Sequence, residues 1–151
     1  MLFEEIVFGP IKSRRLGVSL GVNVLPTEKK YCSFNCIYCE CGWNKIDTSI
    51  QVPLNKREDI KKALYKKLSE STKEFNTTID SITFSGNGEP TLHPDFVEII
   101  DITINLRNKY IPNAKISVLT NGTMLHKKEI FDAISKIDNN IIKIDGGTYE
   151  T

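Results

Sequence analysis

The sequence predicts an α/β fold with parallel strands. Apolar strand patterns alternate along the chain with amphipathic helix patterns, and this alternation implies parallel strands joined by right-handed crossovers. Each predicted strand is followed by a loop that carries cysteine, glycine or polar residues. In parallel α/β folds, functional groups collect on the loops after the carboxyl ends of the strands. We therefore expect a functional site at that edge of the sheet.

Four strands are expected. The first covers residues 18–24, where apolar side chains alternate with small or polar ones until Pro26 ends the pattern. The later strands are expected at residues 79–85, 115–120 and 141–144.

Three helices are expected between these strands. Asn55 and Glu58 have the spacing of a capping box, and apolar residues then recur on one helical face. Pro94 suits the first turn of the second helix because its missing N–H would have no partner there. His93, just before it, is interpreted as a helix-start residue rather than a catalytic base. The third helix is expected over residues 125–137.

Composition favours one folded domain. The chain has 151 residues, of which 40% are hydrophobic, enough for a single core. No apolar run approaches the roughly 18 residues that indicate a membrane span. The net charge of +1 gives no overall drive toward nucleic acid or membrane surfaces. Lys12, Arg14 and Arg15 form a local basic cluster. Two alternatives remain for it: an anion-binding or RNA-facing role, or a structural ion pair.

Cys32, Cys36 and Cys39 form a C-x3-C-x2-C run after the first predicted strand. Residues 1–5 lack the apolar segment of a signal peptide, so we expect a cytoplasmic chain with reduced thiols. Clustered thiols then indicate metal binding or catalysis rather than disulfides. Zinc is the main rival because Cys41 supplies a fourth sulfur. The short Cys39–Cys41 spacing argues against zinc, and we expect Cys41 to be a loop thiol rather than a ligand.

The cysteine run carries a family resemblance. A [4Fe–4S] cluster in an ordinary carrier takes four cysteines, so a cluster on three leaves one iron open. Together with Gly86-Asn87-Gly88-Glu89-Pro90 after an apolar strand, the run resembles the radical S-adenosylmethionine (SAM) superfamily. The opening, with Phe8-Gly9-Pro10 and Ser19-Leu20-Gly21-Val22-Asn23, resembles the iron–sulfur oxidoreductases related to the tRNA wyosine-base synthesis enzymes. The implied fold is a partial TIM-like (β/α) barrel of the radical SAM type, with about four strands and three helices present.

The resemblance implies an enzyme with a [4Fe–4S] cluster and SAM as cofactors. SAM would chelate the open iron, and reduction of its sulfonium would give a 5′-deoxyadenosyl radical that abstracts a hydrogen atom from the substrate. The electron requires a low-potential donor such as flavodoxin or ferredoxin. tRNA-base modification is the first expected reaction, and activation of a glycyl-radical enzyme is the second. A zinc-binding structural or RNA-binding module and an electron-transfer domain are the alternatives from other classes.

The resemblance also assigns site residues. The expected cluster ligands are Cys32, Cys36 and Cys39. The expected SAM contacts are Tyr38 at the adenine, Gly86, Asn87, Gly88 and Glu89 at the ammonium, Asn121 at the carboxylate, and Asp145 at the ribose. Loop packing, turn and capping roles compete for each of these SAM contacts. Asn87 also stands where the family more often has glycine.

The predicted elements are too few for the complete barrel of the family. We therefore expect residues 1–151 to be the N-terminal part of a radical SAM core domain that continues after the fourth strand. The missing C-terminal half of the barrel is the expected partner of this part, because an unpaired strand edge invites association.

Overall fold

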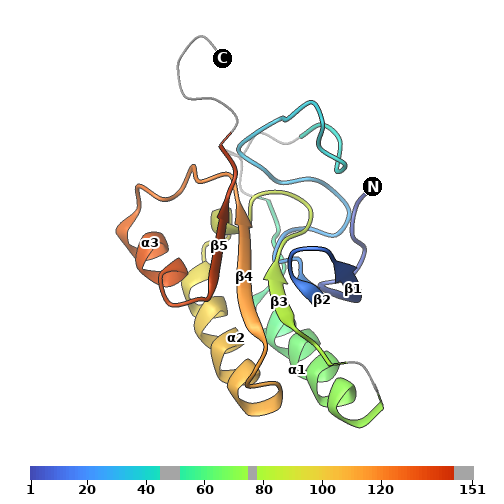
Figure 1. Ribbon diagram of the computed structural model, residues 1–151. Helices are drawn as coiled ribbons and strands as arrows, with labels where there is room; N and C mark the ends of the chain where they lie inside the picture. The colour runs from blue at the N-terminus through green and yellow to red at the C-terminus, as the bar shows by residue number, and fades with distance from the viewer. Residues whose placement is uncertain (45–51, 75–77, 145–151) are drawn as a thin grey trace.

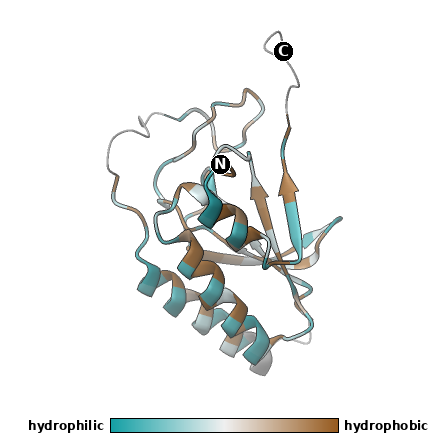
Figure 2. Cartoon of the chain, turned by 90° about the vertical axis from the view of Figure 1, so that its left-hand side faces the viewer, coloured by the Kyte–Doolittle hydropathy of each residue, from teal (hydrophilic) through white to brown (hydrophobic). Residues whose placement is uncertain are grey.

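The computed structural model describes residues 1–44, 52–74 and 78–144. These residues form one open sheet with the helices on one of its faces (Figures 1 and 2). The elements, in chain order, are β1 (Val7–Ser13), β2 (Gly17–Val22), α1 (Arg57–Glu74), β3 (Ser81–Phe84), the short 3-10 helix η1 (Pro90–Leu92), α2 (Phe96–Tyr110), β4 (Lys115–Thr120), α3 (Lys128–Ile134) and β5 (Asn139–Ile142).

The five strands lie in the order β1-β2-β3-β4-β5. From β2 to β5 every neighbouring pair is parallel, with a helix in each of the three connections. The register aligns Leu20, Ile82 and Ile116 across the middle of the sheet. The predicted α/β fold with parallel strands is therefore confirmed, and its fourth strand is β5.

β1 was not predicted. It pairs antiparallel with β2, and the register is interrupted between Phe8 and Ile11 around a cis Gly9–Pro10 peptide bond. Glycine and proline in this segment hide the strand pattern, because both are depleted in strand interiors. The pairing depends on a tertiary fit, since the Phe8 ring occupies the space where a Gly21 side chain would be.

The two faces of the sheet differ in polarity. Apolar side chains on the helix-covered face build the core, and each fully buried leucine, isoleucine or phenylalanine contributes about 1.5–3 kcal/mol. The largest of these residues are Leu20, Ile82, Phe84 and Ile116 from the strands, with Ile60, Leu64, Leu68, Phe96, Ile99 and Ile100 from the helices. Small hydroxyl side chains lie between them in sequence and bond to one another, from Ser19 through Thr83 and Ser81 to Ser117. The uncovered face is thus polar.

The predicted capping box of the first helix is wrong. The Asn55 amide donates instead to the carbonyls of Asn23 and Leu25, which fixes the segment after β2. The carbonyl of Lys56 accepts the N–H of Ile60 at the helix start. The helix begins at Arg57, so Asn55 lies one residue too early to be its N-cap, and the amide bonds hold the side chain on the segment after β2 instead.

The other two helices begin later than predicted. α2 starts at Phe96, two residues after Pro94, and the Phe96 N–H donates to the carbonyl of His93. α3 covers only Lys128–Ile134, because residues 122–127 form turns in which Leu125 donates to Gly122. Among the residues that the structure describes, no helix combines the length and apolarity that crossing a bilayer requires.

His93 fixes the start of α2, as predicted. Its ring is 3% exposed. Nδ1 accepts the Asp95 N–H at 3.0 Å, so Nε2 carries the proton and donates to the Asn55 carbonyl at 2.8 Å. Burial lowers the pKa of His93 below 6.5, although the Asn55 bond and nearby acidic side chains oppose the shift. The neutral ring therefore belongs to the folded state.

This pKa predicts a pH dependence of stability. The unfolded chain takes up a proton on His93 at a pH where the folded chain does not, so stability is complete above the unfolded pKa and declines as pH falls through it. Replacing His93 by Gln, which can still donate to Asn55, should reduce the loss of unfolding free energy between about pH 7 and pH 5. Urea unfolding of the full-length protein measures this. The matched control is His126→Gln at the other, exposed histidine; equal pH slopes for both variants would contradict the assignment.

Candidate functional site

A cavity of about 510 Å³ lies at the carboxyl ends of the parallel strands. Its wall combines the cysteine loop after β2, the glycine-containing loop after β3 and the polar end of β4 (Figure 1). The predicted site residues that line it are Cys32, Cys36, Tyr38, Cys39, Gly86, Gly88, Glu89 and Asn121. Three loops that are far apart in the sequence therefore contribute to one cavity.

The cysteine loop is held against the loop after β3 by backbone contacts. Tyr31 and Gly88 form an isolated parallel bridge. The Tyr31 N–H donates to the Asn87 carbonyl at 2.8 Å, and the Glu89 N–H donates to the Tyr31 carbonyl at 3.1 Å. Gly88 has φ 142°, and a Cβ there would lie 1.8 Å from the Tyr31 oxygen. Only glycine permits this approach.

None of the four cysteines is in a disulfide, and all four are half-buried. Burial raises the pKa of Cys32. Burial also acts upward on Cys39, but the Cys41 N–H and the Lys30 ammonium outweigh it and hold the pKa of Cys39 below its usual value. Burial, together with the negative charge of Cys39, raises the pKa of Cys41. Lys30 is itself 3% exposed and donates to the Gly42 carbonyl at 2.9 Å.

The donor set of this loop fits an iron–sulfur cluster. The Cys32 sulfur accepts from the Phe34 N–H at 3.4 Å and from the Asn121 amide at 3.7 Å. Hydrogen bonds to the sulfurs are a normal feature of such clusters and tune their potential. Among the described residues, no three Cys, His, Asp or Glu side chains are already converged to hold a metal ion. Cys32, Cys36 and Cys39 share the cavity wall without meeting at one point.

Glu89 presents a fixed carboxylate to the same cavity. It is 2% exposed. Oε1 accepts from the Thr91 N–H and hydroxyl and, at 2.7 Å, from the Thr120 hydroxyl, while Oε2 accepts the Asn121 N–H at 2.7 Å. No lysine or arginine in the described part of the chain forms an ion pair with it. A buried carboxylate without a cation is suited to receive one from a ligand.

The structure does not bring the Asn87 side chain to the cavity. Asn87 is fully buried, and its amide donates to the carbonyls of Phe3, Pro26 and Thr27. Its oxygen accepts the Phe3 N–H at 2.8 Å. The side chain therefore ties the N-terminal segment to the loop after β3, and the glycine that is more frequent at this position in the family could not do so.

Asn121 and Tyr38 both line the cavity. Asn121 donates from its amide to the Ser33 hydroxyl at 2.9 Å, and its oxygen accepts from Thr123, so it braces the cysteine loop against the end of β4. Tyr38 is 57% exposed, with the Lys143 ammonium 3.6 Å from the centre of its ring. Asp145 lies outside the described residues.

The cavity also contains residues that sequence reasoning did not place in it, although an anion-binding role had been left open for the basic cluster that includes Arg15. Their side chains come from the β1–β2 hairpin, from the start of the cysteine loop and from the ends of β4 and β5: Arg15, Lys30, Leu119, Ile141 and Lys143. Lys30 lies two residues before Cys32 in the sequence, and this proximity could have predicted its place in the cavity. The others are brought in only by strand pairing.

Comparison with known proteins identifies the family. The model described as "Radical SAM superfamily" matches residues 30–149, which include all three predicted cluster ligands and the loop after β3. The chain belongs to the radical SAM superfamily. This family uses SAM with a [4Fe–4S] cluster, and the three cysteines and Glu89, which line one cavity, suit that pair.

Proteins similar in sequence to this chain are longer than it. It is 36% identical over 135 residues to a "UPF0026 protein" of Helicobacter pylori, over 88% of this chain and 40% of that protein. It is 26% identical over 126 residues to an "S-adenosylmethionine-dependent nucleotide dehydratase" of Selenomonas ruminantium, over 82% of this chain and 38% of that protein. The chain thus spans about 40% of the H. pylori relative.

A solved structure has a similar fold. The crystal structure of BtrN in complex with AdoMet and 2-DOIA superposes with a TM-score of 0.52 at 22% identity, over 86% of this chain and 47% of that one. The fold predicted from the sequence, part of a radical SAM (β/α) barrel, agrees with this match.

Mutation of Asn87 can test whether its side chain has a structural role or binds the cofactor. Asn87→Ala removes the buried hydrogen bonds to three carbonyls, so we expect a loss of about 2–4 kcal/mol of stability. Asn108→Ala, at an exposed position of α2, should change stability by less than about 0.5 kcal/mol. Urea unfolding of the full-length protein measures both. An Asn87 variant as stable as wild type but weakened in SAM binding would instead place this side chain on the cofactor.

Proposed function

We propose that the protein is a SAM-dependent radical enzyme in which Cys32, Cys36 and Cys39 hold a [4Fe–4S] cluster. The observation that carries this proposal is one cavity wall that joins three thiols to a buried carboxylate without a cation partner among the described residues. When bound, cluster and cofactor together supply one-electron cleavage of the sulfonium and hydrogen abstraction from a substrate. The chain supplies the ligands, the orientation of the cofactor and the exclusion of water.

The other site residues act on the cofactor by charge and shape. Glu89 accepts the ammonium of its methionine part, because the carboxylate is already held by four donors and needs no reorganisation. Gly86 and Gly88 let the loop after β3 pack against Asn23 and Tyr31, where a Cβ would overlap them, and both glycines line the cavity. Asn121 meets the carboxylate, Tyr38 the adenine and Asp145 the ribose.

The substrate is a nucleotide, and a base within tRNA is the first choice. Two observations support this choice. The opening of the chain resembles the enzymes related to tRNA wyosine-base synthesis, and the S. ruminantium relative is named for a nucleotide substrate. The enzyme acts as an oxidoreductase in the cytoplasm, where thiols stay reduced. It takes its electron from a flavodoxin or ferredoxin, because a low-potential cluster needs an external donor.

Cluster loss tests the ligand assignment. The full-length protein, reconstituted anaerobically with iron and sulfide, should cleave SAM to 5′-deoxyadenosine and methionine when dithionite is added. Single Cys→Ala changes at positions 32, 36 and 39 should each abolish the cluster absorbance and this cleavage. Cys41→Ala is the matched control and should keep both, because Cys41 is expected not to be a ligand.

Other outcomes of this experiment would overturn the proposal. A colourless protein with one bound zinc that depends on all four cysteines would indicate a structural module. A brown protein whose reduced electron paramagnetic resonance (EPR) signal ignores SAM would indicate an electron carrier.

The Glu89 carboxylate should control SAM affinity. Glu89→Gln keeps the shape but removes the charge, and a lost charge-assisted hydrogen bond weakens binding by on the order of tenfold to a hundredfold. Glu98→Gln, at an exposed position of α2, should leave affinity unchanged. Equilibrium binding of SAM to the oxidised full-length protein measures both variants. Equal affinity of the Glu89 variant and the wild type would remove Glu89 from the cofactor site.

A further inference from the structure

A second cavity continues from the first across the uncovered face of the sheet. It has a volume of about 470 Å³ and lies beside the amino-terminal halves of β3, β4 and β5. Arg15 and Ile141 line both cavities, so the two meet at these side chains. Among the described residues, none of the cysteines and none of those assigned to the cofactor line the second cavity. The second cavity is therefore available to a ligand other than the cofactor.

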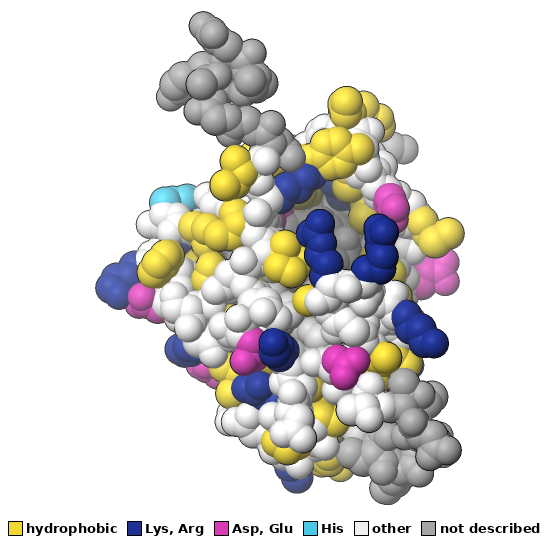
Figure 3. Space-filling view, viewed as in Figure 1, with side chains coloured by type: hydrophobic (Ala, Val, Ile, Leu, Met, Phe, Trp, Pro, Cys, Tyr) yellow, Lys and Arg dark blue, Asp and Glu magenta, His cyan; other side chains and the backbone are white. Residues whose placement is uncertain are grey.

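Hydrogen-bond donors dominate this second space. Arg15 and Lys115 are its cations, and the amides of Asn113 and Asn139 add further donors. Its one carboxylate, Asp80, already accepts the Val18 N–H at 2.8 Å. Figure 3 shows several Lys and Arg side chains around the hollow of this face. The chemistry of this wall suits an anion.

Arg15 stands at the junction of the two cavities on a fixed hairpin. The Ser13 hydroxyl accepts the N–H groups of Arg15 and Leu16 at 3.3 and 3.2 Å. Gly17, at φ 68°, leaves no room for a side chain, since a Cβ would lie 2.3 Å from the Asp80 Oδ2. The turn that carries Arg15 is thus locked to β3.

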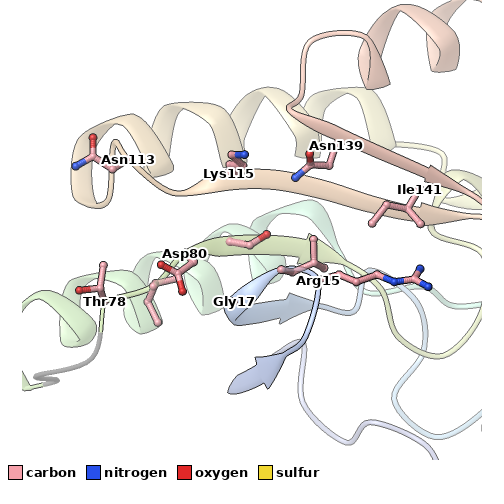
Figure 4. Close-up of a pocket in the computed structure, with 11 residues that line it drawn as sticks. Arg15, Gly17, Thr78, Asp80, Asn113, Lys115, Asn139 and Ile141 are labelled. Atoms are coloured by element: carbon pink, nitrogen blue, oxygen red, sulfur yellow. The ribbon is translucent and has the colours of Figure 1, made fainter.

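In the part of the chain that the structure describes, the Arg15 guanidinium has no partner. Arg15 is exposed, and within the described ranges its side chain makes no hydrogen bond or ion pair. Figure 4 shows it pointing away from the Asp80 carboxylate and along the strands toward their carboxyl ends. Lys30, by contrast, is bonded to the Gly42 carbonyl, and Lys143 lies over Tyr38. Within the described ranges the Lys115 ammonium has no ion pair either, but Lys115 lines only the second cavity, so Arg15 is the cation available to a ligand at the junction.

We propose that Arg15 binds a phosphate group of the substrate at the junction of the two cavities. The inference rests on the proposed function and deepens it, because a nucleotide is the substrate class that brings a phosphate. Leu119 and Ile141 are apolar residues of the first cavity, and Ile141 also lines the second, so the rest of the nucleotide would lie against them. An arginine can hold a phosphate through two parallel N–H···O bonds, which fixes orientation as well as affinity.

Binding measurements on the full-length, cluster-containing protein with SAM present test the proposal. The probes are the common ribonucleoside 5′-monophosphates, their nucleosides and unfractionated tRNA. We expect at least one phosphate-bearing probe to bind, with affinity weakened about tenfold or more by Arg15→Gln and less by Arg15→Lys. Arg14→Gln is the matched control, since Arg14 is an exposed neighbour that lines neither cavity. It should bind within about twofold of wild type.

The outcomes separate the possibilities. Dependence on Arg15 for a mononucleotide indicates a free nucleotide, and the same dependence for tRNA alone indicates a phosphate within RNA. The proposal is overturned if Arg15→Gln binds like wild type, if both arginine variants lose affinity equally, if nucleosides bind as well as their phosphates, or if no phosphate probe binds. The effect of SAM on the EPR signal of the reduced cluster is recorded alongside. If wild type lacks that effect, the proposed function fails; if the effect persists without an Arg15 effect, only the phosphate site fails.

Discussion

The close approach of the Tyr31 backbone to Gly88 is the constraint on which the site depends. Two hydrogen bonds and one missing side chain place the first cysteine of the loop beside the carboxylate of Glu89. Each bond contributes only about 0.5–1.5 kcal/mol. The steric term is larger, because any Cβ at position 88 would overlap the Tyr31 oxygen. A loop without regular structure is thereby fixed to a buried strand end, and its thiols share a cavity with residues that follow two other strands.

The site separates charge in a way that suits its proposed ligands. Glu89 offers a single carboxylate without a cation partner among the described residues, held by hydroxyl and backbone donors rather than by an arginine. Lys30 lies under the cysteine loop, where its charge favours thiolates. Arg15 stands on the turn between β2 and β1, the strand that was not predicted. The zwitterionic end of a cofactor and the anionic end of a substrate would thus meet opposite charges at different walls.

The sequence predicted those parts of the fold that follow from local pattern. Residues 115–120 form β4 as expected. Alternation of apolar and polar residues indicates such a strand, because successive side chains point to opposite faces of the sheet. The gathering of loops at one edge followed from parallel strand order alone. Tertiary contacts determine the rest. The Phe8 ring packs over Gly21, and this fit allows the Gly-Pro segment to form a strand. The side chains of Asn55 and Asn87 bind buried carbonyls instead of capping a helix and contacting SAM, as had been expected of them. Arg15 reaches the cavity through an antiparallel pairing for which the sequence carried no signal.

The central claim is that three cysteines hold an iron–sulfur cluster with one iron left for SAM. Mössbauer spectroscopy of the full-length protein, reconstituted with ⁵⁷Fe, tests it most directly. The account predicts a [4Fe–4S] cluster in which one iron site changes its isomer shift when SAM is added, in wild type and in Cys41→Ala alike. A protein without such a cluster, or one whose irons all remain indifferent to SAM because Cys41 ligates the fourth, would contradict it.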